Sequence, residues 1–444
     1  MRIPVSEAAR VLRANVVGAA TAESQGVSYD SRTLKPGNLF VAVVAARDGH
    51  DFVNDAVRAG ASSVLVQREI ANCSVPQIIV DDTEAALTDL GRWAREVLSS
   101  QVEGRVVGIT GSVGKTTTKD FVAAAIGSKF TVGASEKSLN NDIGLPATIL
   151  NAPDGVESLV LEMGMRGFGE IARLARIARP DIAVITRVGE SHGERVGGVD
   201  GVARAKGELV ESLSSTGVAV LNGDDPRVVA MRLLSDARAY TYGSAASDDM
   251  RFFDVKQTGA TGIAFRFASR WGDGECVLAT PGLHMVSNAA AALLVAAVVD
   301  CDLSEAAAAL GHAELSPMRM AVHRMGGLTI VDDSYNASPI SMMAALDTVA
   351  AMPAARRVAV LGLMAEIAES EAMHRAVAEH AARLDIEIIA VGTDSYGARR
   401  IDAHDEVAAV VKGLPSDSVV LFKASRVVGL DRIVRFFVAP NIGA

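Results

Sequence analysis

The stretch 106–118 constrains the fold of this chain more than any other part of it. Its first residues, 106–109, are apolar and predict a buried strand, which turns through Gly111 and Gly114. A helical pattern follows over about 119–126. A strand, a glycine-rich turn and a helix point backbone N–H groups and the positive end of a helix at one place, an arrangement that holds phosphate groups. We therefore predict an anion site at this turn.

Two polar residues after the turn indicate that the anion is a nucleotide. Lys115 can reach the terminal phosphates, and the Thr116 hydroxyl can ligate Mg²⁺. The usual phosphate loop has a glycine where this chain has Ile109, so the match is to a shorter variant, Thr-Gly-Ser-x-Gly-Lys-Thr-Thr. The alternative is a glycine-rich turn that precedes a lysine by chance. The residues expected to bind a nucleoside triphosphate are Gly111, Ser112, Gly114, Lys115, Thr116 and Thr117.

Length and composition narrow the class of protein. A chain of 444 residues is long enough for roughly three domains. Its 49% hydrophobic and 22% charged residues are typical of globular proteins, and its net charge of −10 argues against a nucleic-acid or anionic-membrane partner. Three scattered cysteines, an N-terminus without an apolar signal segment, and a longest apolar run (289–299) too short to cross a bilayer predict a cytoplasmic protein. We expect a monomer.

The order of predicted strands and helices gives three α/β domains. The first is small, the central one alternates strand and helix as in a doubly wound, mostly parallel sheet, and the third is Rossmann-like. Ser6 is expected to cap the first helix. Period-two runs near 251–280 predict a small antiparallel flap. Few contacts that constrain the domains relative to one another are expected across the joins near 101–104 and 313–327. The predicted domains are 1–101, 102–315 and 316–444. The strands predicted in the second domain are 105–110, 158–162, 181–187, 217–221 and 238–242. Those predicted in the third domain are 328–332, 357–361, 387–391 and 418–422, and a helix at 425–437 is predicted to follow them.

Polar residues follow the strands of the central domain at the ends where ligands of parallel sheets bind. Glu162 ends one strand, His192 follows the next, and Lys206 lies on the helix after that. Near Thr116 they could bind a divalent metal ion beside the phosphates. The alternatives are a salt-bridged glutamate, a histidine with ordinary partners and a surface lysine. The polar turn that contains Asn140 and Asn141 is suited to gripping substrate or a cation.

The third domain carries a second set of strand-end residues. Asp333 closes its first strand, where a carboxylate suits a ribose hydroxyl or a metal ion; the alternative is a capping role for the helix that starts near Pro339. The stretch 423–426 ends a later strand and, with Asn336, could line a pocket for a short zwitterion, whose carboxylate Arg426 or a helix N-terminus would take. The alternative is that these charges are solvated.

In this order and spacing, the motifs resemble those of the Mur ligases, ATP-dependent amide ligases that build the stem peptide of peptidoglycan. Within that family, Asp333-Ser-Tyr-Asn336 is similar to the members that join D-alanyl-D-alanine to UDP-N-acetylmuramoyl-tripeptide. A sister ligase that adds a single diamino acid or glutamate is the first alternative, and a regulatory ATPase acting as a switch is the second. The motifs are 28–32, 36–40, 110–116, 140–146, 162–171, 189–192, 203–208, 222–226, 332–337 and 423–426, so the resemblance covers essentially the whole chain.

The resemblance implies a role for each matching residue. The resemblance implies that Lys115, Lys206 and His192 are catalytic. It also implies that two Mg²⁺ ions are bound by Thr116, Glu162, His192 and a carbamylated Lys206. The remaining matches imply that Asn288 contacts adenine, that Arg319 and Asp333 contact phosphate and ribose, that Asp30, Ser31 and Arg32 bind the UDP-sugar, and that Asn140, Asn141, Asn336, Lys423, Ser425 and Arg426 bind the peptide substrates. The chain departs from the usual family motifs at 137–142, 283–285, 318 and 424.

Overall fold

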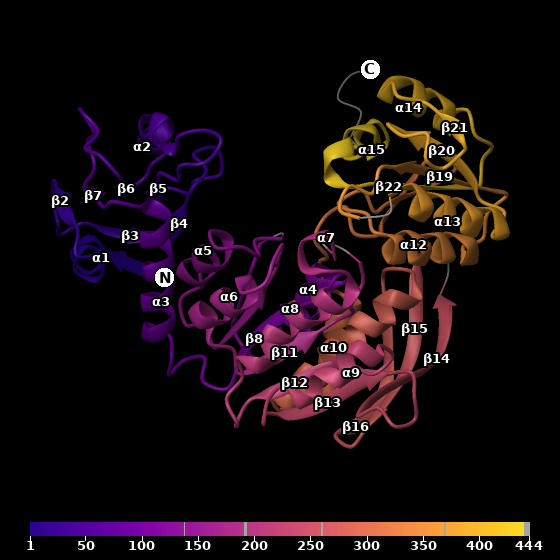
Figure 1. Cartoon of the computed structure of the whole chain (residues 1–444), viewed down its shortest axis with the longest axis horizontal. Helices are drawn as coiled ribbons and strands as arrows, with labels where there is room; N and C mark the ends of the chain where they lie inside the picture. Colours follow the sequence, from indigo (N-terminus) through magenta and orange to yellow (C-terminus); the bar gives the residue numbers. More distant parts are fainter. Residues whose placement is uncertain (137, 191–192, 259–260, 368–369, 439–444) are drawn as a thin grey trace.

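The structure is a computed structural model of the whole chain, and it describes every residue except 137, 191–192, 259–260, 368–369 and 439–444. The described residues form three α/β units that follow one another along the chain (Figure 1). The first lies at the left of the view, the central unit below the middle and the third at the upper right. No helix within the described ranges is long and apolar enough to cross a bilayer. The predicted α/β class is confirmed.

The first unit has a small sheet whose strands are parallel except at one edge, where β2 is antiparallel. Ser6 does not cap the first helix, so that prediction was wrong: the helix begins at Val5, directly after Pro4, without a side-chain cap. The sheet order is β2 (Asn15–Val17), β7 (Gln77–Ile79), β6 (Ser63–Val66), β5 (Leu39–Val41), β4 (Val27–Ser28); β1 (Arg2–Pro4) pairs with β3 (Glu23–Gln25), and the helices are α1 (Val5–Leu12), α2 (Val53–Arg58) and α3 (Thr83–Val97).

The central unit has a long sheet in which β8 lies between β11 and β10, toward one edge, and all five predicted strands are present. The predicted flap is instead part of this sheet, because β13 pairs with β14 through Tyr242 and Met250, and Phe265 and Phe267 of β15 are buried in the core that includes α10. The order is β16 (Gly272–Leu278), β15 (Gly262–Ser269), β14 (Met250–Thr258), β13 (Arg238–Gly243), β12 (Val218–Asn222), β11 (Ile182–Ile185), β8 (Val106–Thr110), β10 (Ser158–Glu162), β9 (Val132–Ala134). The helices are α4 (Lys115–Gly127), α5 (Gly144–Leu150), α6 (Glu170–Ala178), α7 (Gly193–Val196), α8 (Val199–Glu211), α9 (Pro226–Ala230), α10 (Leu283–Val298) and α11 (Leu303–Gly311).

The third unit has the four predicted strands as a parallel core. Its predicted last helix is in fact interrupted: a 3-10 turn, Arg426–Val428, ends at Gly429, whose φ of 73° a helix cannot continue through. The sheet order is β17 (Ala321–Met325), β18 (Leu328–Asp332), β22 (Ser418–Lys423), β19 (Arg356–Gly362), β20 (Glu387–Val391), β21 (Arg399–Arg400), and the helices are α12 (Pro339–Ala351), α13 (Ser370–Arg383), α14 (His404–Lys412) and α15 (Asp431–Val438).

The first unit is fastened firmly to the central unit, contrary to the expectation of few constraints there. The Asn151 side chain accepts from the backbone N–H of Val27 at 2.8 Å and donates to its carbonyl at 3.0 Å, as a neighbouring strand would. Arg95 of α3 donates to the Ala178 carbonyl at 2.7 Å, and the amino group of Met1 donates to a carbonyl beside α5. One hydrophobic core continues from α3 into α5 and α6. These contacts hold the two units as one body.

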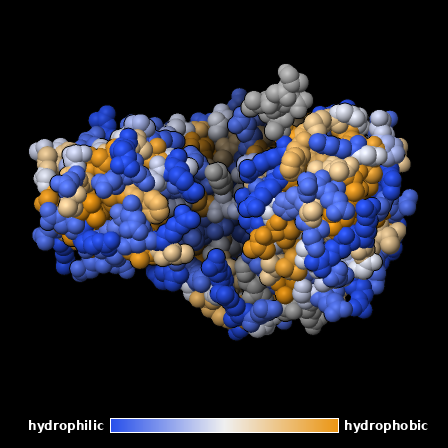
Figure 2. Space-filling view, turned by 90° about the horizontal axis from the view of Figure 1, so that it is seen from above, coloured by the Kyte–Doolittle hydropathy of each residue, from blue (hydrophilic) through white to orange (hydrophobic). Residues whose placement is uncertain are grey.

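The third unit meets the central unit close to the phosphate loop. The Ser316 N–H donates to the Asp120 carboxylate at 2.7 Å, which ties the chain before β17 to α4. A Cβ added to Gly189 would lie 2.6 Å from the Cδ1 of Ile340, so the start of α12 packs directly on the loop after β11. Seen from above, the surface is hollowed between the two outer units (Figure 2).

Candidate functional site

The loop between β8 and α4 has the conformation of a phosphate cradle. Gly114, at φ +85°, turns the chain directly into α4, which therefore begins at Lys115 and not at the predicted residue 119. The threonines after Lys115 lack the apolar period that marks a helix, which explains that error. A Cβ on Gly111 would lie 1.8 Å from the Thr186 hydroxyl, so only glycine fits there.

The strand end after β11 holds this loop in place. The Ser112 N–H donates to the Arg187 carbonyl at 2.6 Å, and the Thr186 hydroxyl donates to the Val113 carbonyl at 2.6 Å. Lys115 folds back over the loop, since its Nζ donates to the Gly111 carbonyl at 2.8 Å. Burial lowers the pKa of Lys115, and the nearby Glu162 carboxylate opposes that shift. The loop and its lysine are therefore preorganised around the place that a phosphate would occupy.

Oxygen atoms gather beside the start of α4. The Thr116 hydroxyl donates to the buried Glu162 carboxylate at 2.8 Å and lies 3.1 Å from the Ser138 hydroxyl. Asn140 donates to the other Glu162 oxygen at 2.7 Å. Hard oxygen donors beside a phosphate loop suit Mg²⁺, which takes few protein ligands and shares its shell with phosphate and water. The residues present fit that ion, whereas the predicted ligand His192 lies outside the described residues.

Lys206 of α8 is buried with a relative exposure of 3%, so the surface-lysine alternative is wrong. Its ammonium makes no hydrogen bond or ion pair with any described residue. Burial, and then the charge of Lys115, set its pKa well below the ordinary value. A buried amine without a partner costs free energy unless a ligand or a covalent modification compensates for it.

The third unit contributes a guanidinium to the same place. The Arg319 side chain stacks on the Tyr335 ring at 4.2 Å and donates to the Thr116 hydroxyl at 3.2 Å. Asp333 accepts from Lys423 at 2.5 Å and from the backbone of Met320, so it does not cap α12. That helix is capped by Ser338, and the capping alternative for Asp333 is therefore wrong.

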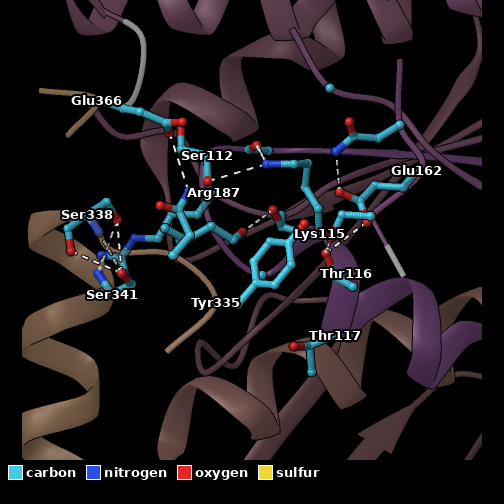
Figure 3. A pocket seen from close by; sticks show the side chains of 18 of the residues that line it. Ser112, Lys115, Thr116, Thr117, Glu162, Arg187, Tyr335, Ser338, Ser341 and Glu366 are labelled. Carbon is cyan, nitrogen blue, oxygen red and sulfur yellow. Dashed lines mark hydrogen bonds between the residues drawn. The ribbon is translucent and has the colours of Figure 1, made fainter. Parts of the chain in front are cut away.

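A cleft of about 660 Å³ lies between the phosphate loop and the third unit (Figure 3). It brings together nearly all of the predicted site residues, whereas Asp30, Ser31 and Arg32 lie on the first unit and do not line it. Arg426 borders it but forms an ion pair with Asp431 at 3.2 Å. The predicted residues that line the cleft are Gly111, Ser112, Gly114, Lys115, Thr116, Thr117, Asn140, Asn141, Glu162, Lys206, Asn288, Arg319, Asp333, Asn336, Lys423, Ser425 and Arg426.

Several lining residues were not predicted. Arg187, Tyr335 and Glu366 all line the cleft, and Ser138 contacts Thr116. Arg187 follows β11 at the ligand-binding end of the sheet, so its position along the chain was a usable signal. Glu366 belongs to no motif that the sequence analysis recognised.

Comparison with known proteins settles the family. The model of the Mur ligase middle domain matches residues 109–296, and that of the Mur ligase, glutamate ligase domain matches 318–434. The UDP-N-acetylmuramoyl-tripeptide–D-alanyl-D-alanine ligase of Bacillus subtilis (strain 168) is 35% identical over 434 residues, which are 92% of each chain. This chain belongs to the Mur ligase family.

Solved Mur ligases share its fold over nearly their whole length. A crystal structure of MurF from Acinetobacter baumannii matches with a TM-score of 0.86 and 25% identity over 98% of each chain. The MurF ligase of Thermotoga maritima, solved in complex with ADP, matches with a TM-score of 0.79 and 29% identity, covering 93% of this chain and 97% of that one. The three-domain architecture is therefore that of a Mur ligase.

One wall of the cleft in this Mur ligase depends on a buried histidine. His374 Nε2 accepts the Met364 N–H at 3.0 Å, so its Nδ1 carries the proton and donates to the Ser370 carbonyl. Next to Met364, the Ala365 N–H donates to the Ser425 hydroxyl at 2.9 Å. His374 thus positions a segment that faces the cleft.

Acid should weaken this arrangement. Burial lowers the pKa of His374 below its ordinary value near 6.5, so its contribution to stability is complete above that pH and is lost as the pH falls below it. The melting temperature should therefore fall between about pH 7 and pH 5.5, and less steeply in His374→Gln, whose amide oxygen can still accept the Met364 N–H. The exposed His312→Asn serves as control and should keep the wild-type slope. Equal slopes in wild type and His374→Gln would refute this role.

Proposed function

We propose that this chain is an ATP-dependent ligase that joins D-alanyl-D-alanine to UDP-N-acetylmuramoyl-tripeptide. The observation that carries the proposal is the single cleft in which the phosphate loop, the buried Glu162 and Lys206, and Arg319 of the third unit face one another. A ligase needs nucleotide and two substrates in one enclosed place, whereas a regulatory switch needs only the nucleotide. The relatives that match over nearly the whole chain carry the name of the dipeptide ligase, which disfavours the single-amino-acid alternative.

Each of the three units has its own proposed role in binding the substrates and ATP. Residues 1–101 would bind the UDP-sugar through Asp30, Ser31 and Arg32, and residues 102–315 would bind ATP, with Asn288 at the adenine. Residues 316–444 would complete the ATP site with Arg319 and Asp333. The peptide substrates would lie against Asn140 and Asn141 on one side and Asn336, Lys423, Ser425 and Arg426 on the other. We further propose that the protein acts as a cytoplasmic monomer; light scattering that gives twice the chain mass would refute the monomer.

Mg²⁺ would be held by Thr116, Glu162 and His192, and a carbamylated Lys206 would be a ligand for a second ion. Bound there, it would supply positive charge beside the phosphates of ATP. The Thr116 hydroxyl and the Glu162 carboxylate already lie within hydrogen-bonding distance, so no large movement of the chain is needed to bring these donors together.

The chemistry follows from the need to activate a carboxylate. The terminal carboxylate of the tripeptide attacks the γ-phosphorus of ATP, and ADP leaves, which gives an acyl phosphate. The amine of the dipeptide then attacks the acyl carbon, and inorganic phosphate leaves with one carboxylate oxygen. Lys115 and the loop N–H groups stabilise the charge on the transferring phosphoryl group. The third unit, which carries the stacked Arg319 and Tyr335, would keep water from the acyl phosphate when it closes over the substrates.

An acceptor screen tests this function. Phosphate release from ATP should require both UDP-N-acetylmuramoyl-tripeptide and D-alanyl-D-alanine, and diaminopimelate, lysine or D-glutamate should support less than about a hundredth of that rate, since a site built for a zwitterionic dipeptide leaves polar groups unpaired with other acceptors. A free amino acid that proves the better acceptor would establish the sister-ligase alternative. Hydrolysis that is independent of any acceptor would instead indicate a switch.

We also propose that Lys206 carries a carbamate, formed when its neutral amine adds to CO₂ and releases a proton. Its burial, its lack of a partner and its lowered pKa all favour this reaction. Protein equilibrated with carbon-13 CO₂ should show a carbamate carbon resonance that is missing from Lys206→Ala, and that variant should lose at least about 100-fold in kcat. A wild-type spectrum identical to that of Lys206→Ala would refute the modification.

A further inference from the structure

The arginines that line the cleft near the phosphate loop differ in whether a protein group already contacts the guanidinium. Arg426 forms its ion pair with Asp431, and Arg319 is engaged by Tyr335 and Thr116. Arg187 also lines the cleft, yet its side chain makes no hydrogen bond or ion pair with any residue that the structure describes. An exposed guanidinium in a substrate cleft without a protein partner is available to an anionic ligand.

The backbone of Arg187 is fixed at the meeting point of two units. Its carbonyl accepts the Ser112 N–H at 2.6 Å, so the residue moves with the phosphate loop. Two residues later, Gly189 packs against Ile340 in the first turn of α12. Figure 3 shows Arg187 between the phosphate loop and the side of the cleft where Ser338 and Ser341 lie. The guanidinium therefore belongs to the part of the cleft that the third unit closes.

Nothing at the start of α12 neutralises this charge. Ser338 and Ser341 satisfy each other in a capping box, so their hydroxyls are already engaged. The end of α12 that faces this part of the cleft is the positive end of a 13-residue helix, which disfavours a second cation and favours an anion. Glu366 lies on the same wall and accepts from Asn336 at 3.4 Å.

The anions of the proposed reaction can be assigned by elimination. The phosphates of ATP have the loop N–H groups and Lys115, and the reacting carboxylate of the tripeptide belongs beside Thr116 and Lys206. The carboxylate of the acceptor remains. The nearby cations of the third unit are already paired, Lys423 with Asp333 at 2.5 Å and Arg426 with Asp431. In the central unit, the Arg166 side chain also lines the cleft without a partner among the described residues. It follows β10 beside the turn that contains Asn140, so we assign it to the tripeptide and Arg187 to the acceptor.

We propose that Arg187 binds the terminal carboxylate of the acceptor dipeptide and so determines which acceptors the enzyme takes. This inference rests on the proposed ligase function. It makes Arg187 a specificity-determining residue that holds the far end of the dipeptide while the amine reaches the acyl phosphate. An acceptor without a terminal negative charge loses this contact.

Steady-state kinetics of Arg187→Gln test the assignment. The KM for D-alanyl-D-alanine should rise about 10- to 100-fold, because a charge-assisted hydrogen bond to a carboxylate is lost, while the KM values for ATP and UDP-N-acetylmuramoyl-tripeptide stay within about 2-fold. Arg187→Lys should recover part of the loss. Arg232→Gln removes an exposed arginine that does not line the cleft and should behave as wild type.

D-alanyl-D-alaninamide separates charge recognition from a general disturbance of the loop. The wild type should use it about 10- to 100-fold less well than the dipeptide, and Arg187→Gln should use both almost equally. The inference is overturned if Arg187→Gln still discriminates against the amide, if its KM change falls on ATP or the tripeptide, or if Arg426→Gln raises the dipeptide KM more. Failure of the wild type to ligate D-alanyl-D-alanine would contradict the ligase function itself, a separate result.

Discussion

The hydrogen bonds between the phosphate loop and the end of β11 are the contacts on which the rest of the site depends. They fix Ser112 and Val113 against Thr186 and Arg187, so the loop cannot move without the central sheet. The same strand end touches α12 through Gly189. The end of β11 therefore contacts both the phosphate loop and the third unit.

The cleft concentrates charges that the protein alone does not balance. Lys115 and Lys206 both have lowered pKa values, and Lys115 contributes to the shift of Lys206. The Arg187 side chain lacks a partner among the described residues, whereas Asn151, which joins the first unit to the central one, has both its amide oxygen and its amide nitrogen paired with the backbone of Val27. This contrast separates the structural interface from the functional cleft. Charged groups that bind phosphate, carboxylate or metal lower the stability of the folded protein as long as those ligands are absent.

The sequence predicted the strands and site residues that a local pattern determines. It did not predict the contacts that depend on packing between segments far apart in the chain. Apolar runs located the strands, and the rule that ligands bind at strand ends located Glu162 and Asp333. The contacts between Asn151 and Val27, and the pairing of β13 with β14, join segments without any shared local pattern, so no periodicity could reveal them. The position of α4 at Lys115 was missed because a run of threonines has no apolar face. Arg187 was missed because a lone arginine is not a motif.

The central claim is that this cleft activates a carboxylate as an acyl phosphate, and oxygen-18 transfer tests it most directly. UDP-N-acetylmuramoyl-tripeptide labelled with oxygen-18 in its terminal carboxylate would be turned over with ATP and D-alanyl-D-alanine, and the released phosphate analysed by mass spectrometry. The account predicts that each phosphate carries one oxygen from the carboxylate. Unlabelled phosphate formed together with the ligated product would contradict it, because the oxygen would then have come from water.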